Sequence, residues 1–382
     1  MSLFDDDVIF DDDDLEEGSA KIIDGLSEPK AMSLCLGHDD QEKLFIEMYQ
    51  NDCMPHAVIF SGAQGIGKTT MAFRLARFLL KNGKDANQDS LFGGDAMPEA
   101  LSSLDVPQDD PIFSRIASGG HADLLHIYRA FDDSKGKQDA SLKVENLRKI
   151  EPFLRKTASE GGWRVVIVED ADTMNRSAQN AILKILEEPP AQVMIILIAH
   201  RVGILIPTIR SRARVMPFSV LNPETMRDLL ARQGHVLSAQ DLESVTALSG
   251  GSIGQAIRYI EQGGLDMLKT VLDMLDAYPQ WNWRKIHELS SSLSSAAQDK
   301  DYRLFVDVMQ WVFRQMLFLK ARGSNDLPQY LKSEALQMMM GDCSLEKLIE
   351  ISDGLKDHFN RIDFSNLDRR DAVRAAFLVI NQ

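Results

Sequence analysis

The chain has 382 residues, of which 44% are hydrophobic and 26% charged, as in ordinary globular proteins of two or three domains. Its 42 Lys and Arg residues and 57 Asp and Glu residues give a net charge of −15, and nine of the acids lie within residues 1–17, which contain no Lys or Arg. A basic surface along the whole chain is therefore excluded, so a nucleic-acid contact must come from a local patch or from partner subunits.

The cysteine content and the apolar runs restrict the class of protein further. Cys35, Cys53 and Cys343 lie far apart and form no CxxC pair, which excludes a disulfide framework and a cysteine-based zinc site. The N-terminus is acidic where a signal peptide would be positive. The longest apolar run, Val193 to Ala199, is about a third of the length that a membrane span needs. We therefore expect a cytoplasmic protein with no zinc and no membrane partner.

Residues 1–30 are predicted to form an acidic disordered tail. Like charges repel one another along this segment, and its apolar islands, such as Val8 to Phe10, are too small to offset the entropy of ordering. Two interpretations of the tail stay open. It is either a solubilising segment or a short linear motif that binds a partner.

Residues 31–218 alternate between short apolar runs and helical patterns. Four runs predict strands, at residues 57–61, 124–128, 165–168 and 193–199. The last two are apolar at consecutive positions, which is typical of parallel strands covered on both faces. Between them, the spacing at residues 144–154 and 178–185 predicts helices, the second of which is ended by Pro189 and Pro190. The pattern indicates an α/β domain with a parallel sheet.

The strand signals end after Pro217, and the remaining chain has helical patterns only. Residues 219–264 are expected to form a small helical domain whose helices are separated by Gly250 and Gly251. Residues 265–382 are expected to form an all-α C-terminal domain with apolar stripes at 305–316 and 348–359. Such stripes form either the core of a helical bundle or a subunit interface.

A complete phosphate-binding loop follows the first predicted strand. Residues 62–69 spell GAQGIGKT, the Walker A pattern, and a helix with apolar residues on one face comes after it. Glycines allow backbone N–H groups to surround phosphate oxygens, Lys68 supplies positive charge, and the hydroxyl of Thr69 suits Mg²⁺. The loop predicts a nucleotide site, with an empty, vestigial loop as the alternative.

The residues around this loop carry a resemblance to a known family. The strings PHAVIFSGAQGIGKTTMAFRLARFLL (55–80), GGHADLLHI (119–127), EGGWRVVIVEDADTMNRSAQNAILKILEEPP (160–190) and IPTIRSRAR (206–214) occur in a familiar order. The chain resembles the bacterial clamp-loader branch of the AAA+ ATPases, and within it the delta prime subunit family of DNA polymerase III. The resemblance covers about residues 35–260, and it implies an AAA+ P-loop domain, a helical lid (219–264) and a helical collar (265–382).

The resemblance assigns roles to individual residues. It implies ATP or ADP with Mg²⁺ as cofactor, bound through the phosphate-loop residues Gly62, Gly65, Gly67, Lys68, Thr69 and Thr70. Thr69 and Glu169 are the implied Mg²⁺ ligands, and Glu169 with Asp170 is the acidic Walker B pair. Arg212, in a Ser-Arg motif, is implied to be an arginine finger that reaches a neighbouring subunit's ATP site. His38 falls near the adenine side, and Ala199 falls at the sensor-1 position.

Several departures from the family pattern predict weak hydrolysis. The Walker B order is inverted. If Glu169 binds Mg²⁺, Asp170 must position water from a shorter side chain, and if Asp170 binds it, Ala171 leaves no base. The sensor-2 arginine is replaced by Gly254 or Gln255. Residues 82–120 contain no cysteine where relatives carry a zinc module. Solvated strand-end acids are the alternative interpretation of Glu169 and Asp170, and a solvated basic cluster that of Arg212.

The function implied is that of the delta prime subunit, in a complex that opens the sliding clamp and sets it on primed DNA, with the delta and gamma/tau subunits as partners. We expect weak or static ATP binding and a weak or absent ATPase. Nucleotidyl transfer would belong to other subunits of the DNA polymerase III holoenzyme. The alternatives are an ATP-hydrolysing motor subunit similar to gamma/tau and a non-catalytic scaffold that binds nucleic acid.

Overall fold

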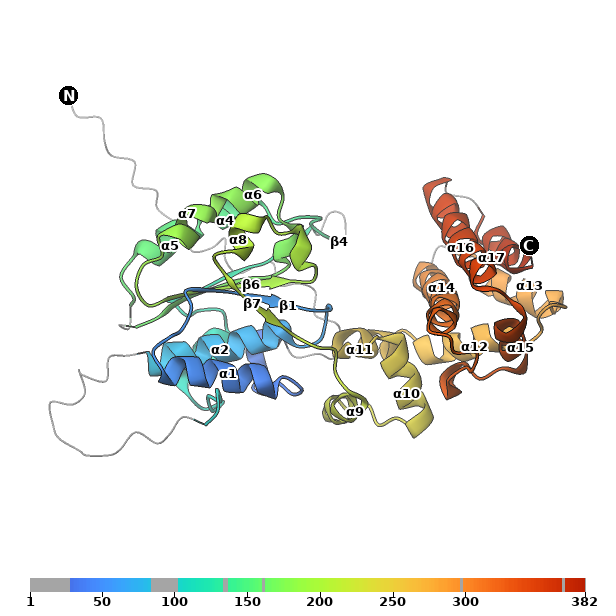
Figure 1. Cartoon of the computed structure of the whole chain (residues 1–382), viewed down its shortest axis with the longest axis horizontal. Helices are drawn as coiled ribbons and strands as arrows, with labels where there is room; N and C mark the ends of the chain where they lie inside the picture. Colours follow the sequence, from blue (N-terminus) through green and yellow to red (C-terminus); the bar gives the residue numbers. More distant parts are fainter. Residues whose placement is uncertain are drawn as a thin grey trace, which may run out of the picture. The chain divides into compact units, whose positions relative to one another are not determined.

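A computed structural model of the chain describes residues 28–83, 102–132, 137–159, 162–295, 298–365 and 368–381. The chain divides into two compact units, Met1–Val220 and Leu221–Gln382 (Figure 1). The acidic tail predicted at 1–30 lies outside the described residues up to position 27. The first described element is the short 3₁₀ helix η2 (Pro29–Ala31).

A parallel five-stranded sheet forms the centre of the first unit. Its strand order is β2-β5-β6-β1-β7, and the bounds are β1 Ala57–Ser61, β2 Leu124–Ile127, β5 Arg164–Val168, β6 Val193–Ala199 and β7 Arg214–Pro217. Every residue of β5 and β6 is buried, as their continuous apolar sequence requires. The four strands predicted from apolar runs are confirmed to within one residue at each end.

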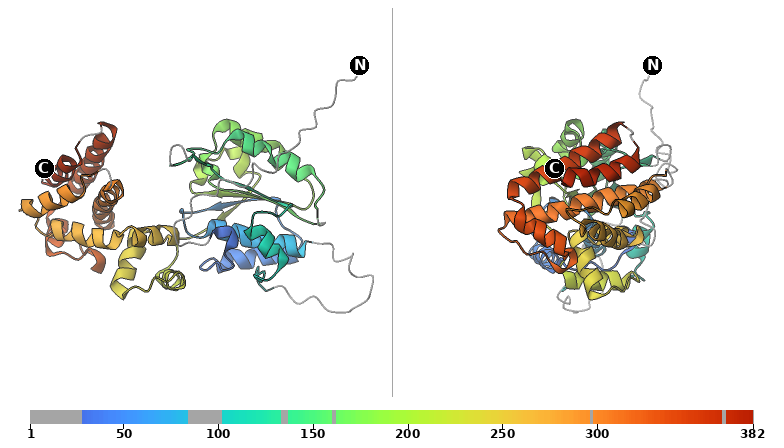
Figure 2. Two further views of the ribbon diagram at one scale, coloured as in Figure 1. Left: turned by 180° about the vertical axis from the view of Figure 1, so that it is seen from behind. Right: turned by 90° about the vertical axis from the view of Figure 1, so that its right-hand side faces the viewer.

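Helices cover both faces of this sheet, as Figure 1 and the views in Figure 2 show. One face carries α1 (Asp39–Gln50), α2 (Lys68–Asn82) and α3 (Pro111–Ala117). The other carries the short helices α4 (Val144–Arg148), α5 (Ile150–Arg155), α6 (Arg176–Ala181), α7 (Leu183–Glu187) and α8 (Pro207–Arg210). Alternate strand residues enter the two apolar cores, because successive side chains of a strand point to opposite faces. The predicted α/β class is confirmed.

Some elements of the first unit differ from the predicted ones. The helical patterns at 144–154 and 178–185 are each divided into two short helices. Strand β7 was not predicted, because it lies at an edge of the sheet and only one of its four residues is buried. A small hairpin of β3 (Phe131–Asp132) and β4 (Lys137–Gln138) follows β2, and the 3₁₀ turns η3 (Ala171–Thr173) and η4 (Val202–Ile204) follow β5 and β6.

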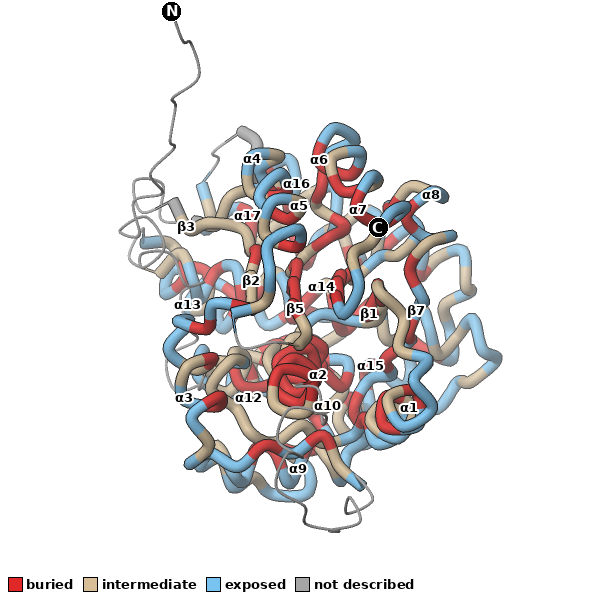
Figure 3. The backbone as a smooth tube through the Cα atoms, turned by 90° about the vertical axis from the view of Figure 1, so that its left-hand side faces the viewer, coloured by how far each residue is buried: buried red, intermediate tan, exposed pale blue. Residues whose placement is uncertain are grey.

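Helix α2, which follows the phosphate loop, is the most deeply buried helix of the first unit in Figure 3, and two buried arginines fix the chain around it. The Arg77 guanidinium donates to the carbonyls of Lys30 and Met32, at 2.9 and 2.6 Å. Arg74 pairs with Glu42 at 2.9 Å and also with Asp105. Buried charge is tolerated where it is paired and hydrogen-bonded, so these contacts hold the segment before α1 and the segment after residue 102 against α2.

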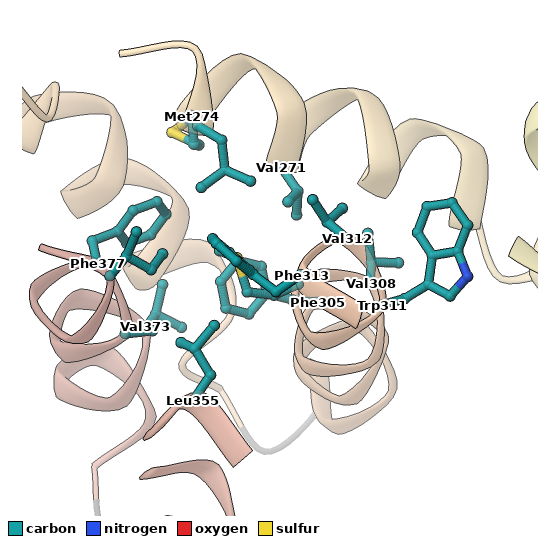
Figure 4. Close-up of a cluster of buried hydrophobic side chains, with 14 of the residues drawn as sticks. Val271, Met274, Phe305, Val308, Trp311, Val312, Phe313, Leu355, Val373 and Phe377 are labelled. Carbon is teal, nitrogen blue, oxygen red and sulfur yellow. The ribbon is translucent and has the colours of Figure 1, made fainter. Parts of the chain in front are cut away.

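The second unit is helical throughout its described residues. Its elements are α9 Pro223–Arg232, α10 Ala239–Leu248, α11 Ile253–Glu261, α12 Gly264–Leu275, α13 Trp283–Ser292, α14 Asp299–Ala321, η6 Gln329–Leu331, α15 Glu334–Asp342, α16 Leu345–Ser365 and α17 Arg369–Ile380. The predicted stripes at 305–316 and 348–359 lie in α14 and α16 and enter one core with α12 and α17 (Figure 4). Leu248 of α10 belongs to the same core, so the boundary between lid and collar at 264 stays a prediction.

Within the described residues, no helix is both long enough and apolar enough to cross a membrane.

The core of the second unit allows a test of its packing. Phe305 on α14 is fully buried, whereas Phe318 on the same helix is 49% exposed. We predict that Phe305→Ala lowers the free energy of unfolding of this unit by about 3–5 kcal/mol, because it removes buried apolar surface and leaves a cavity. Phe318→Ala is the matched control, with a loss of at most about 1 kcal/mol. Denaturant unfolding of the full chain, followed by tryptophan fluorescence, measures both, and equal losses would contradict the packing.

Candidate functional site

The candidate site lies where the carboxyl ends of three neighbouring strands meet. The phosphate loop follows β1, Glu169 and Asp170 follow β5, and His200 follows β6. Because β6 lies between β1 and β5 in a parallel sheet, the loops after these strands are brought to one edge. The sequence predicted site residues in the phosphate loop and in the acidic pair. It did not predict His200.

The backbone of the phosphate loop has positive φ angles at three glycines. Gly62, Gly65 and Gly67 have φ angles of 153°, 75° and 101°, which L side chains rarely adopt. A Cβ atom at Gly62 would also lie 2.4 Å from the carbonyl oxygen of Phe218. Glycine is therefore required there, and α2 begins at Lys68 with its N-terminus at the loop.

Lys68 is only 3% exposed, and its ammonium group is held by three acceptors. Nζ donates to the carbonyl oxygen of Gly62 at 2.9 Å, to that of Ala63, and to Nδ1 of His200 at 3.1 Å. Burial lowers the pKa of Lys68 to about 8, against the opposite effects of Asp170 and Asp172. All three donors of the ammonium are thus already engaged.

A buried histidine, His38, is hydrogen-bonded to the backbone of the phosphate loop. His38 is 2% exposed, and burial lowers its pKa, so the neutral ring donates from Nε2 to the carbonyl of Ile66 at 2.7 Å. Its ring packs edge-on against Phe218 with centroids 4.8 Å apart. The sequence predicted that His38 lies near the adenine side of the site. In the structure its side chain contacts the phosphate loop at Ile66.

Asp170 is held by side chains from two other segments of the site. Its Oδ1 accepts a hydrogen bond from Nε2 of His200 at 2.8 Å, and its Oδ2 accepts from Nε and Nη2 of Arg129 at 2.7 and 2.6 Å. Burial by itself raises the pKa of Asp170, but the contacts with His200 and Arg129 outweigh it, so the pKa lies below its ordinary value. Asp170 is therefore a carboxylate in which each oxygen already accepts at least one hydrogen bond.

Glu169 has a different environment from its neighbour. Its Oε1 lies 2.9 Å from Nε2 of His126, a residue of β2, and each of these side chains is 26% exposed. Within the described residues, Oε2 has no hydrogen bond, so it is the carboxylate oxygen of the Walker B pair that remains for a cation. The two residues are far apart in sequence and meet because β2 and β5 are neighbouring strands, with Glu169 directly after β5.

A third acid after β5 fixes the backbone after β6. Asp172 is 6% exposed, and its two oxygens accept from the backbone N–H groups of His200 and Arg201 at 3.0 and 3.1 Å. Asp172 therefore fixes the backbone of His200, and with it the position of the imidazole between Lys68 and Asp170. Sequence reasoning missed His200, Arg129 and Asp172, although a polar residue directly after a buried parallel strand is a usable signal for the first.

The other predicted site residues lie on α2 and at the end of β6. Thr69 and Thr70 lie in the first turn of α2, where Thr69 is partly exposed and Thr70 is 7% exposed. Ala199 is the buried last residue of β6 and pairs with Ser61 of β1. The methyl group of Ala199 cannot hydrogen-bond a phosphate. The first polar side chain after β6 is that of His200.

Arg212 lies at the surface of the first unit, after α8. Its side chain is 34% exposed and forms an ion pair with Glu187 of α7 at 2.9 Å. Its guanidinium also donates to the carbonyl of Thr208 at 3.1 Å and to the hydroxyl of Ser211 at 3.3 Å. Arg212 follows the end of α8 at Arg210 by two residues.

The residues of the loop fit the phosphates of a nucleotide. The three positive-φ glycines, the N-terminus of a fifteen-residue helix and the ammonium of Lys68 form a donor set suited to phosphate oxygens. Oxygen donors for a cation are the hydroxyl of Thr69 and Oε2 of Glu169. Among the side chains that the structure describes, no group of three or more His, Cys, Asp or Glu is arranged to hold a metal ion by itself.

A family model and individual proteins that match this chain are all described as subunits of DNA polymerase III. A family model described as DNA polymerase III, delta subunit, matches residues 105–222. The chain is 30% identical over 304 residues to DNA polymerase III subunit delta' of Bacillus subtilis, covering 77% of this chain and 83% of that protein. It is 32% identical over 208 residues to subunit delta' of Pseudomonas aeruginosa, covering 54% of this chain and 56% of that protein.

A second subunit type is also similar to the chain. The identity to DNA polymerase III subunit gamma/tau of Mycobacterium bovis is 33% over 214 residues, which covers 54% of this chain and 32% of that protein. The match to the B. subtilis delta' protein is more extensive and spans most of both chains. The chain belongs to the family of DNA polymerase III delta prime subunits.

Proposed function

We propose that this chain is a clamp-loader subunit that binds ATP statically and takes part in the complex that opens the sliding clamp and sets it on primed DNA. The observation that carries the nucleotide part is the contrast between a complete phosphate loop and an Asp170 whose two oxygens are both engaged. Membership of the delta prime family supports the role in the complex.

Nucleotide binding rests on residues of the loop and its helix. With ATP or ADP bound, the backbone N–H groups of the loop and Lys68 would bind the phosphates, and Thr69 and Glu169 would hold Mg²⁺. The cation would neutralise charge on the phosphates. Lys68 must leave at least one of its three present acceptors to reach a phosphate oxygen.

Slow hydrolysis follows from the environment of Asp170. A general base needs a free oxygen within hydrogen-bond reach of the attacking water and a pKa near the working pH. Asp170 meets both requirements poorly, because His200 donates to Oδ1, Arg129 donates twice to Oδ2, and these contacts lower its pKa. Glu169 is the other acid, but in this proposal its free oxygen is a metal ligand. We therefore propose that the site retains ATP with little turnover.

The proposed role of Arg212 is toward another subunit. A guanidinium inserted from outside stabilises the charge on a transferring phosphoryl group, with effects of about 10³–10⁵ on turnover in GTPases. The ion pair with Glu187 is partly exposed, and such pairs contribute about 0–1 kcal/mol, so Arg212 is readily released to a phosphate. A subunit with weak hydrolysis of its own can still donate this group.

The second unit is the proposed site of assembly. We assign residues 219–264 to a lid and residues 265–382 to a collar that joins the delta and gamma/tau subunits. The large apolar residues Trp283, Phe318, Met338, Ile349 and Leu378 of this unit are exposed and are candidates for this contact. A hydrolysing motor subunit similar to gamma/tau is the second candidate, favoured by the similarity to that protein. The occupied oxygens of Asp170 argue against it.

A binding measurement tests the nucleotide site. We predict that Lys68→Ala weakens ATP binding by about tenfold to a hundredfold, since a hydrogen bond to a charged group contributes about 1.5–3 kcal/mol. Titration calorimetry of the full chain with Mg²⁺ and ATP measures the Kd. Lys81→Ala, at the other end of the same helix, is the matched control and leaves the Kd unchanged. An unchanged Kd for Lys68→Ala would show that the loop does not bind the phosphates.

A reconstituted complex tests Arg212. We predict that Arg212→Ala leaves folding and the chain's own ATP affinity intact but lowers the DNA- and clamp-stimulated ATPase of the assembled complex by at least about tenfold. Arg212→Lys should restore little, because a lysine lacks the planar fork of the guanidinium. The exposed neighbour Arg210 provides the control variant Arg210→Ala. Equal stimulated ATPase for Arg212→Ala and Arg210→Ala would reduce Arg212 to surface charge.

A further inference from the structure

The exposed side of α14 in the second unit carries arginines on both sides of an exposed phenylalanine. Its opposite side carries buried residues such as Val308 and Val312, which face the core in Figure 4. Five exposed residues recur along α14 at intervals of four or seven, which places them on one side of a helix. They are Arg303, Asp307, Arg314, Phe318 and Arg322.

The last turn of α11 lies beside this side of α14. Burial raises the pKa of Asp307 on α14, and the guanidinium groups that oppose this effect are those of Arg258, Arg314 and Arg303. Three arginines from two helices are therefore close to one carboxyl group. We call the five exposed residues of α14, together with Arg258 and Tyr259 of α11, the arginine face.

Three arginines of this face have no carboxylate partner. Within the described residues, no carboxylate oxygen lies within 4.0 Å of a guanidinium nitrogen of Arg258, Arg314 or Arg322. Arg303, at one end of the face, pairs with Asp299 at 2.8 Å. The face thus carries positive charge that no described acid neutralises at contact distance, in a chain whose net charge is −15. Such a local patch is complementary to an anion.

Two of the unpaired guanidinium groups lie over aromatic rings. Arg322 lies 3.9 Å from the ring centroid of Phe318, whose side chain is 49% exposed. Arg258 lies 5.8 Å from the ring centroid of Tyr259, and its Nε is buried with no hydrogen-bond partner among the described residues. Buried donors in native proteins are nearly always paired, so this face has a donor that the chain itself leaves unsatisfied.

We propose that the arginine face binds a single strand of nucleic acid. The guanidinium groups of Arg314 and Arg322 bind phosphates, because a planar fork of donors fits two phosphate oxygens. A base stacks on the exposed pair of Phe318 and Arg322, since every base offers a π-face to an aromatic ring or a guanidinium. From Arg303 to Arg322 the helix spans about 28 Å.

The exposed aromatic ring decides between the anionic partners that match the charge. An acidic protein would pair with the arginines but would leave Phe318 without a stacking partner. A duplex would offer phosphates, but its bases are already stacked on one another. A single strand satisfies both the guanidinium groups and the ring. The inference assigns a direct nucleic-acid contact to this chain and does not rest on the phosphate loop.

Fluorescence anisotropy of the full chain without nucleotide tests the face. The probe is a labelled thymidylate oligomer of about 15 nucleotides, within the range of known site sizes, at several NaCl concentrations. The double variant Arg314→Gln with Arg322→Gln removes two charges, and Arg314→Lys with Arg322→Lys keeps them. Arg284→Gln is the matched control, because Arg284 is exposed on α13, outside the face, and pairs with Glu288.

We expect the unaltered chain to bind the oligomer with a Kd of about 1–100 μM that rises steeply with salt. The double glutamine variant should raise the Kd at least about tenfold and lower the slope of log affinity against log salt by about 1.4, because each lost phosphate contact on a single strand removes about 0.7. The double lysine variant should keep the slope, and Arg284→Gln should keep both the slope and the Kd.

Phe318→Ala tests the stacking. It should weaken binding of the thymidylate oligomer at least about fivefold, as the loss of one stacked base does elsewhere. It should not change binding of an abasic oligomer with the same number of phosphates.

Three results would overturn the proposal. Absence of binding, or a double glutamine variant that binds as Arg284→Gln does, would remove the face as a nucleic-acid site. Polyglutamate that binds as tightly as the oligomer and is unaffected by Phe318→Ala would show that the face takes an acidic protein instead. A duplex bound as tightly as the single strand would contradict the stacking. The proposed nucleotide site would stand in each case.

Discussion

The position of β6 between β1 and β5 determines the geometry of the candidate site. This strand order places His200, the first residue after β6, between Lys68 of the phosphate loop and Asp170 of the acidic pair. Asp172 holds the backbone of His200 in place, so the imidazole reaches both neighbours at hydrogen-bond distance. A lysine and an aspartate far apart in sequence are joined because a third strand lies between theirs.

The charges of the site are balanced within the chain itself. A buried carboxylate is unfavourable unless it is paired and hydrogen-bonded, and Asp170 is compensated by Arg129 and His200. The same compensation makes Asp170 a poor base, because a free oxygen and a higher pKa are what a base requires. In the proposed function, the contacts that stabilise the buried Asp170 carboxylate are therefore also the ones that make hydrolysis slow. Arg212 is partly exposed and is held by a surface ion pair and two local hydrogen bonds, which are contacts of modest strength.

Local sequence patterns predicted the parts of the fold that depend on local physics. The continuous apolar runs of β5 and β6 and the glycine spacing of the loop predicted two buried strands and a phosphate-binding turn, because burial and backbone conformation are encoded residue by residue. The contacts of His200 with Asp170 and of His126 with Glu169 were not predictable, since they depend on which strands are neighbours. Strand β7 was missed because an edge strand lacks a continuous apolar run. The roles of Lys68, Glu169 and Arg212 stay predictions.

The central claim is that the chain retains ATP because the acid at the hydrolytic position is already occupied. Phosphate release by the isolated full chain, at saturating Mg²⁺ and ATP, tests it most directly. The account predicts turnover far below the ordinary range of about 1–100 s⁻¹ for enzymes that transfer phosphoryl groups, in a chain that calorimetry shows to be saturated with nucleotide. Turnover within that range, abolished by Asp170→Asn, would show that Asp170 acts as a base despite its contacts with His200 and Arg129, and would contradict the account.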